Sequence, residues 1–287
     1  MEDPPGTGSP RADAGPGRPA LPEAGMTAAA SGTPGTSSGP LVRRQDRTGA
    51  AVLVLDSPAN RNALSKRLVA EMRAHLADAA ADPAVRAVAI TGTGNTFCSG
   101  ADLSDPPVQQ GSGSFGDLLL NLWDYPKPVV VAVNGHVRAG GFGLLASADV
   151  SVCVETATFS FSEVRLGLVP ALISVLCLRR MTPSSASRYL LTGEVFDPAA
   201  ALQSGLVGSV VPTGALDGAL AEVLDLFQQC EPEALRVTRD LMRRIPLMDV
   251  AAGLDHAAGV SASFFGTDAA AEGIAAFREK RPPRWAG

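Results

Sequence analysis

The sequence predicts an α/β protein in which strand, strand and helix recur as ββα repeats that form a spiral, followed by a C-terminal helical region. Runs of β-branched residues that end at Gly, Pro or Asp are typical of buried strands. Apolar residues at helical spacing lie between these runs, and helical periodicity dominates from Ser184 onward. A single ββα unit leaves its apolar face uncovered, so we expect the units to stack on one another in one domain.

The first 40 residues are mainly Pro, Gly, Ala, Ser and Thr, without apolar periodicity. Such a composition does not offset the entropy lost on ordering the chain. We therefore predict a disordered tail over residues 1–45. This segment lacks the apolar h-region of a signal peptide.

The first repeat begins with a short apolar strand, Ala51–Leu55. Ser65 is then the expected N-cap of a helix with apolar residues four apart, and Asp82-Pro83 ends that helix. The second strand is expected at Val85–Thr91. The later elements follow in the order strand Pro128–Asn134, helix Gly140–Ala148 and strand Val150–Glu155.

The remaining elements are helical. One apolar stripe starts at Leu216 and a second at Leu235, and the last helix is expected over Asp268–Lys280. We therefore divide the folded part into a ββα spiral core at 46–215, which carries the active site, and a C-terminal helical region at 216–287. The helices of that region are expected to cover the core or to form subunit contacts.

The composition excludes several classes of protein. The chain has 287 residues, of which 46% are hydrophobic and 18% charged, and a net charge of -5. This balance argues against a nucleic-acid partner, and no apolar run approaches the roughly 20 residues that span a bilayer. Four cysteines without paired spacing predict neither a metal site nor a disulfide framework, so we expect a cytoplasmic protein with reduced thiols.

Two segments of small residues carry the chemistry. Phe97–Leu103 and Asn134–Gly141 each place glycine directly after an apolar run, where a side chain would block a ligand from the backbone N–H groups. Gly140 lies where a strand turns into a helix, and its N–H therefore has no partner inside that helix. Two such N–H groups that converge on one carbonyl oxygen form an oxyanion hole.

Residues 48–287 resemble the crotonase superfamily, the enoyl-CoA hydratase/isomerase family. The matching segments are Asn62–Ser65, Phe97–Leu103, Asn134–Gly141, Phe161–Pro170 and Ala276–Arg281.

The resemblance implies a crotonase-like spiral whose oxyanion donors are the N–H groups of Ala101 and Gly140, which hold the thioester carbonyl of an acyl-CoA substrate. It also implies that no cofactor is tightly bound, since coenzyme A is part of the substrate. Family members are trimers or dimers of trimers, so we expect a homotrimer or hexamer. The residues that the resemblance places along coenzyme A are Ala63, Ala101, Asp102, Leu103, Phe277 and Lys280.

Hydratases of this family place two glutamates near the reacting carbon. The position of the first is Gly143 here, whereas the second is retained as Glu163. Apolar neighbours should raise the pKa of Glu163, which suits a group that both takes and gives a proton. The alternative is a surface glutamate paired with Arg165 or Arg179.

The missing glutamate leaves three functions open. Hydration of an α,β-unsaturated acyl-CoA comes first, because the segment around Glu163 is similar to the methylglutaconyl-CoA hydratase branch, which also tends to carry glycine at the first position. Isomerisation of the double bond needs only one carboxylate and comes second. The third is an acyl-CoA binding protein with weak turnover.

Three further expectations concern the same region. Restoring glutamate at Gly143 is expected to raise hydration. The segment Ser104–Asp117 is expected to be a mobile loop at the acyl pocket, from which Asp105 or Asp117 could replace the lost carboxylate. His136 is expected to have a packing role.

The remaining motifs argue against two enzyme classes, dinucleotide-binding enzymes and hydrolases with a nucleophile elbow. Gly92-Thr93-Gly94 lacks the third glycine of a dinucleotide fingerprint, and the sequence has no Gly-x-Ser-x-Gly elbow.

Overall fold

The repeats that contain β3-β4, β5-β6 and β7-β8 each divide their two strands between two sheets, whereas β1 and β2 lie in the same sheet. The first strand of a repeat joins a six-stranded sheet of order β1-β2-β3-β5-β7-β9, and the second joins a three-stranded sheet of order β4-β6-β8. All neighbouring strands are parallel except β1 and β2. The repeated ββα organisation predicted from the sequence is therefore confirmed.

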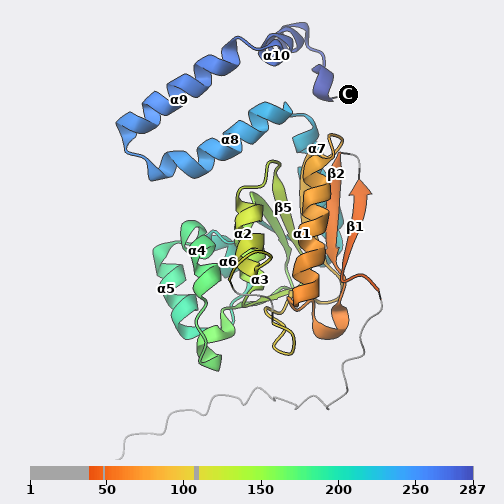
Figure 1. Ribbon diagram of the computed structural model, residues 1–287, viewed down its shortest axis with the longest axis vertical. Coiled ribbons are helices and arrows are strands. Elements are labelled where there is room, and N and C mark those ends of the chain that lie inside the picture. The colour runs from red at the N-terminus through yellow and green to blue at the C-terminus, as the bar shows by residue number, and fades with distance from the viewer. Residues whose placement is uncertain (1–38, 48, 107–109, 287) are drawn as a thin grey trace, which may run out of the picture. The chain divides into compact units, whose positions relative to one another are not determined.

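The computed structural model describes residues 39–47, 49–106 and 110–286 (Figure 1). All of them belong to one unit, residues 37–287. Most of the predicted tail lies outside the described residues. The strands are β1 (Val42–Arg47), β2 (Ala50–Leu55), β3 (Ala87–Gly92), β4 (Thr96–Cys98), β5 (Val129–Val133), β6 (His136–Arg138), β7 (Val150–Val154), β8 (Phe159–Ser160) and β9 (Ser209–Val211).

The helices follow the strands of each repeat and then continue alone to the C-terminus. They are α1 (Lys66–Ala81), α2 (Phe115–Trp123), α3 (Gly141–Ser147), α4 (Ala171–Arg180), α5 (Pro183–Thr192), α6 (Pro198–Ser204), α7 (Leu216–Gln228), α8 (Pro232–Arg244), α9 (Val250–Phe265) and α10 (Asp268–Glu279).

The core lies around the six-stranded sheet. Every residue of β2 and of β5 is buried, as expected for parallel strands covered on both faces. Helix α1 contacts β1 and β2, whereas α7 contacts β5 and β7. The predicted N-cap is confirmed, because the Ser65 hydroxyl accepts a hydrogen bond from the N–H of Leu68 at 3.2 Å.

Two predicted boundaries are wrong. Strand β1 begins at Val42, inside the predicted tail of residues 1–45, because it pairs antiparallel with β2 over its whole length. Helix α2 begins at Phe115, inside the predicted loop Ser104–Asp117. The N-cap Ser114 accepts a hydrogen bond from Asp117 N, and the Asp117 carboxylate accepts one from Gly113 N.

The C-terminal region divides into two parts. Helix α7 contributes Leu216, Leu220 and Leu224 to the main hydrophobic core, whereas the described residues of α8, α9 and α10 contribute none. In Figure 1 these last three helices form the blue layer of the ribbon. Among the described residues, no helix combines the length and the apolar character that a bilayer crossing requires.

Candidate active site

Two loops from different repeats meet at the predicted oxyanion hole. The first follows β4 and contains Gly100, and the second follows β6 and contains Gly140. A Cβ atom on Gly100 would lie 2.6 Å from the Cβ of Ala139 and 3.3 Å from Gly140 N. A Cβ on Gly140 would lie 2.9 Å from Leu64 Cδ1. Gly100 is therefore needed for this close approach of the two loops, whereas a side chain at Gly140 would displace the end of Leu64.

The backbone on either side of this contact is tightly specified. Gly100 has a φ of 94°, and Ala139 adopts the left-handed region with a φ of 45°, which costs a non-glycine residue on the order of 1 kcal/mol. Leu64 N donates to Gly100 O at 2.7 Å, and Asp102 N donates to Leu64 O at 3.0 Å. These two bonds use the groups on either side of Ala101 and leave its own N–H unused.

The N–H groups of Ala101 and Gly140 make no hydrogen bond within the described part of the chain. Both residues line one cavity of about 350 Å³. Backbone donors that remain unpaired beside a cavity are rare, because an unmade hydrogen bond is costly. The pair is therefore available to a ligand oxygen.

Glu163 lines the same cavity. It lies in the 3-10 turn Ser162–Leu166, which follows Phe161, and the Phe161 ring stacks on Phe142 of α3 with the ring centroids 3.8 Å apart. The turn closes through a hydrogen bond from Leu168 N to Glu163 O at 2.9 Å. Core packing thus fixes the turn that presents this glutamate.

The Glu163 carboxyl group has no ion pair among the described residues. Its Oε2 atom is buried without a hydrogen-bond partner, and loss of solvation raises its pKa. The predicted alternative partners bond elsewhere: Arg165 donates to Thr192 O and Arg179 to Val175 O. A buried carboxyl group with an unused oxygen is typical of proton-transfer sites.

The position of the first glutamate, Gly143, is closed by apolar side chains. A Cβ there would lie 2.9 Å from Leu119 Cδ2 of α2 and 3.1 Å from Ile173 Cγ2 of α4. A glutamate at this position alone would require these two side chains to move, so the structure gives no support to the expectation that it would raise hydration.

Neither loop aspartate replaces the missing carboxylate. Asp105 forms an ion pair with Lys66, and Asp117 forms one with Arg73 while capping α2. Among the residues that line the cavity, Glu163 is the one with an ionisable side chain. Cys98 lies near the cavity, and burial raises the pKa of its thiol to about 12, so it stays protonated at neutral pH.

The residues predicted along coenzyme A fall into two groups. Ala63, Ala101, Asp102 and Leu103 lie together, because Leu64 and Ala101 form a parallel bridge. Leu103 lines the cavity and is 76% exposed. Phe277, 85% exposed, and Lys280 lie at the end of α10, and neither lines the cavity.

His136 has a structural partner. Its Nδ1 lies 2.9 Å from Thr158 Oγ1, a contact that links β6 to the segment before β8. Burial and the nearby Arg138 lower its pKa, so it is neutral at pH 7. No group of three or more potential metal ligands occurs among the residues described.

The segment Ser104–Asp117, expected at the acyl pocket, contributes Phe115 to the cavity, whereas the rest of the apolar wall was not predicted. Phe115 of α2 and the run from Leu166 to Ile173 form this wall. A signal for Phe115 was present, since Ser114 and Asp117 have the spacing of a helix cap and apolar residues follow at helical spacing.

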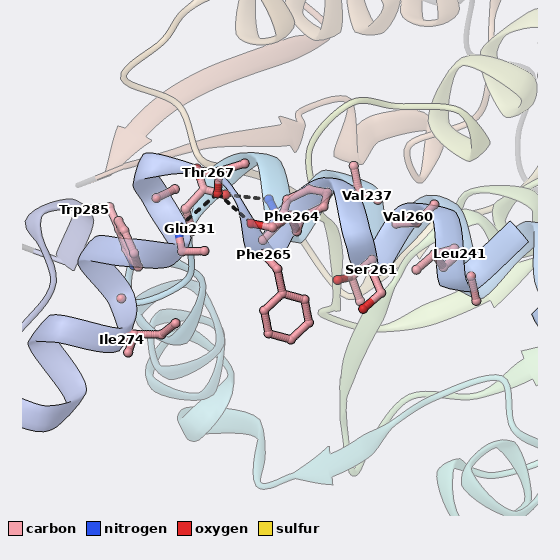
Figure 2. Close-up of a pocket in the computed structure, with 16 residues that line it drawn as sticks. Glu231, Val237, Leu241, Val260, Ser261, Phe264, Phe265, Thr267, Ile274 and Trp285 are labelled. Carbon is pink, nitrogen blue, oxygen red and sulfur yellow. Dashed lines mark hydrogen bonds between the residues drawn. The ribbon is translucent and has the colours of Figure 1, made fainter.

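A larger apolar groove of about 490 Å³ lies among α8, α9 and α10 (Figure 2). It shares no lining residue with the active-site cavity. Its one carboxylate, Glu231, caps α8 by accepting a hydrogen bond from Ala234 N at 2.6 Å. Figure 2 shows the Phe265 ring extending away from the other labelled side chains. Most of the described residues that line this groove are apolar.

Comparisons with known proteins agree with this geometry. The family model described as enoyl-CoA hydratase/isomerase matches residues 45–287. A Thermus thermophilus protein named "Putative enoyl-CoA hydratase" is 38% identical over 245 residues, which cover 82% of this chain and 96% of that protein. The 2,3-dehydroadipyl-CoA hydratase of Escherichia coli is 31% identical, with 86% and 98% covered.

The solved structure of an enoyl-CoA hydratase from Mycobacterium smegmatis superposes with a TM-score of 0.81 at 29% identity, and the match covers 87% of this chain and 100% of that one. The relatives are named as hydratases, which are hydro-lyases, and the matches run from the first strand of the fold to the last helix. The chain is therefore an enzyme of the enoyl-CoA hydratase/isomerase family.

Proposed function

We propose that this enzyme adds water to, or removes it from, the α,β double bond of an acyl-CoA thioester, with Glu163 as its single proton-transferring group. The observation that carries the proposal is the unpaired Oε2 of Glu163 in the same cavity as the two unpaired N–H groups of Ala101 and Gly140. The names of the relatives support the reaction class.

In the proposed mechanism the thioester oxygen accepts hydrogen bonds from Ala101 N and Gly140 N. The Glu163 carboxylate takes a proton from water, and the water oxygen bonds to the β-carbon. Electron density moves to the thioester oxygen, where each N–H donor is worth about 3 kcal/mol. The Glu163 carboxyl then gives its proton to the α-carbon and ends ionised, as it began.

Isomerisation is the second candidate, and the tight packing of side chains around Gly143 favours it. Leu119 and Ile173 would have to move to make room at Gly143 for a second carboxylate that helps to orient water. Glu163 alone could remove a proton from the α-carbon of a β,γ-enoyl thioester and return it at the γ-carbon.

Coenzyme A is proposed as part of the substrate, along Ala63, Asp102 and Leu103, with Phe277 and Lys280 contributing from a neighbouring subunit of a trimer or dimer of trimers. The apolar groove among α8, α9 and α10 supports such an assembly. A cytoplasmic location remains part of the proposal.

The proposal is tested by incubating the enzyme with a panel of enoyl-CoA thioesters in heavy-oxygen water and measuring the products by mass spectrometry. Hydration adds a labelled oxygen, whereas isomerisation leaves the mass unchanged. We expect Glu163→Gln to lower the rate by at least about a hundredfold, while binding of a saturated acyl-CoA persists.

Glu194→Gln is the matched control, because Glu194 forms a surface ion pair with Arg188. This variant should retain the rate of the wild type. Full activity of Glu163→Gln would exclude the proton-transfer role. Binding without turnover by the wild type would instead identify an acyl-CoA binding protein.

A further inference from the structure

A second apolar cavity lies beside the active site, among α2, α4 and Leu247, which follows α8. It has a volume of about 290 Å³. Its walls include Leu120 and Trp123 from α2 and Val175 from α4. The mechanism proposed above uses none of these residues.

The two cavities share one wall residue, the half-buried Leu172 of α4. On the facing helix, Phe115 lines the active-site cavity and the next residue, Gly116, lines the second one. A Cβ on Gly116 would lie 3.8 Å from Leu172 Cδ2, so the two helices face each other here across that side chain. Leu172 therefore forms a partition one side chain thick.

The second cavity matches the chemistry of a hydrocarbon chain. Arg179 is the one residue in its wall with an ionisable side chain, and it donates to Val175 O on its own helix. Leu120 is 58% exposed and Val175 53% exposed, although both are large apolar residues. Apolar side chains that gather in an exposed cavity indicate a ligand or partner that covers them.

The length of the cavity also fits an acyl tail. Its α2 wall runs from Gly116 to Trp123, and a helix rises 1.5 Å per residue, so the wall extends for about 10 Å. Among the described residues that line the active-site cavity, Glu163 is the one with an ionisable side chain, and the proposed function places it at the reacting end. The path over Leu172 is therefore apolar from one cavity to the next.

We propose that the second cavity is a subsite for the distal part of the acyl chain, reached over Leu172, and that the substrates are thioesters with extended apolar chains. Leu172 and Val175 are then the residues that determine specificity for chain length. This inference rests on the proposed function for the identity of the ligand as an acyl-CoA.

The test is a tryptophan at Val175, which would fill the second cavity and leave the active-site cavity unchanged. Leu178→Trp is the matched control, because Leu178 lies on the same helix with 59% exposure and lines neither cavity. Binding of butanoyl-, octanoyl- and dodecanoyl-CoA is measured by titration calorimetry, together with turnover of crotonyl- and dodecenoyl-CoA.

We expect Val175→Trp to weaken dodecanoyl-CoA binding by at least about tenfold, the effect of about two methylene groups returned to water. Butanoyl-CoA binding should change by less than about twofold, and Leu178→Trp should alter neither. Dodecenoyl-CoA turnover should fall in parallel with the binding.

An equal effect of Val175→Trp on short and long chains would overturn the subsite, and so would a wild type that binds dodecanoyl-CoA no more tightly than butanoyl-CoA. Binding that does not depend on chain length is the result expected if a second copy of the chain covers this cavity. Binding that depends on chain length without turnover would contradict the proposed function and leave the subsite standing.

Discussion

At the scale of single residues, the packing around Gly143 limits where a second carboxylate could stand in the candidate site. Its neighbours Leu119 and Ile173 occupy the volume that a longer side chain would need. These two side chains come from different helices, α2 and α4, and both lie against Gly143 of α3. Glu163 is consequently left as the ionisable group of the cavity.

We predict that Gly143→Glu destabilises the protein by about 3 kcal/mol or more, since it overpacks the wall and buries an unpaired charge. Gly218→Glu is the control, because Gly218 also lies in a helix and a Cβ there would meet nothing within 4 Å. Denaturant unfolding measures both variants. Unchanged stability of Gly143→Glu, or a gain in its hydration rate, would contradict the tight packing described around Gly143.

The residues of the candidate site could be predicted where a short stretch of sequence carries the signal for them. Ala101, Gly140 and Glu163 lie in short motifs where small residues or a single carboxyl group carry the signal, and the structure brings all three to one cavity. The packing around Gly143 was not predictable, because it depends on how α2 and α4 pack against α3. These contacts join residues far apart in the chain.

At the scale of elements, length and periodicity decided what could be predicted. Helix α1 and strands β2, β5 and β7 carry long apolar patterns, and the structure confirms them. The strands β4, β6 and β8 have two or three residues each, too few for a periodic signal. Strand β1 is mostly polar, because it lies at the edge of its sheet.

Two arginines of α8 attach this helix to the core. The Arg239 guanidinium is 7% exposed, pairs with Asp149 at 2.6 Å, and donates to the carbonyl oxygens of Leu122 and Tyr125. Arg243 binds the other oxygen of Asp149. The end of α2 and the start of β7 are thus linked to α8 through charged hydrogen bonds.

We predict that Arg239→Ala lowers the free energy of unfolding by about 3 kcal/mol, because two buried carbonyl groups and part of a carboxylate lose their donors. Arg236→Ala, on the exposed side of the same helix, removes a surface pair with Glu233 and should cost less than about 1 kcal/mol. Urea titrations followed by circular dichroism compare the two. Equal losses would show that Arg239 does not anchor α8.

At the scale of the whole molecule, the last three helices carry apolar surface that a single chain does not bury. Helix α7 covers the sheet, whereas α8, α9 and α10 lie outside the main core. Large apolar side chains remain in contact with solvent along these helices: Met242, Val250, Leu254, Phe265, Ile274 and Phe277. A soluble monomer rarely carries so much exposed apolar surface on one region.

We therefore predict that the protein sediments as a trimer or hexamer, and that Phe265→Asp shifts the population toward smaller species. Phe265 is 78% exposed and lines the groove of Figure 2, so burying it against a second copy would contribute about 2 kcal/mol per contact. Leu191→Asp is the matched control, since Leu191 is 77% exposed on α5. Sedimentation velocity over a range of concentrations separates the variants. A wild type that remains monomeric at high concentration, or equal dissociation by both substitutions, would show that the terminal helices are not the interface. Either result would also exclude a contribution of Phe277 and Lys280 from a neighbouring subunit.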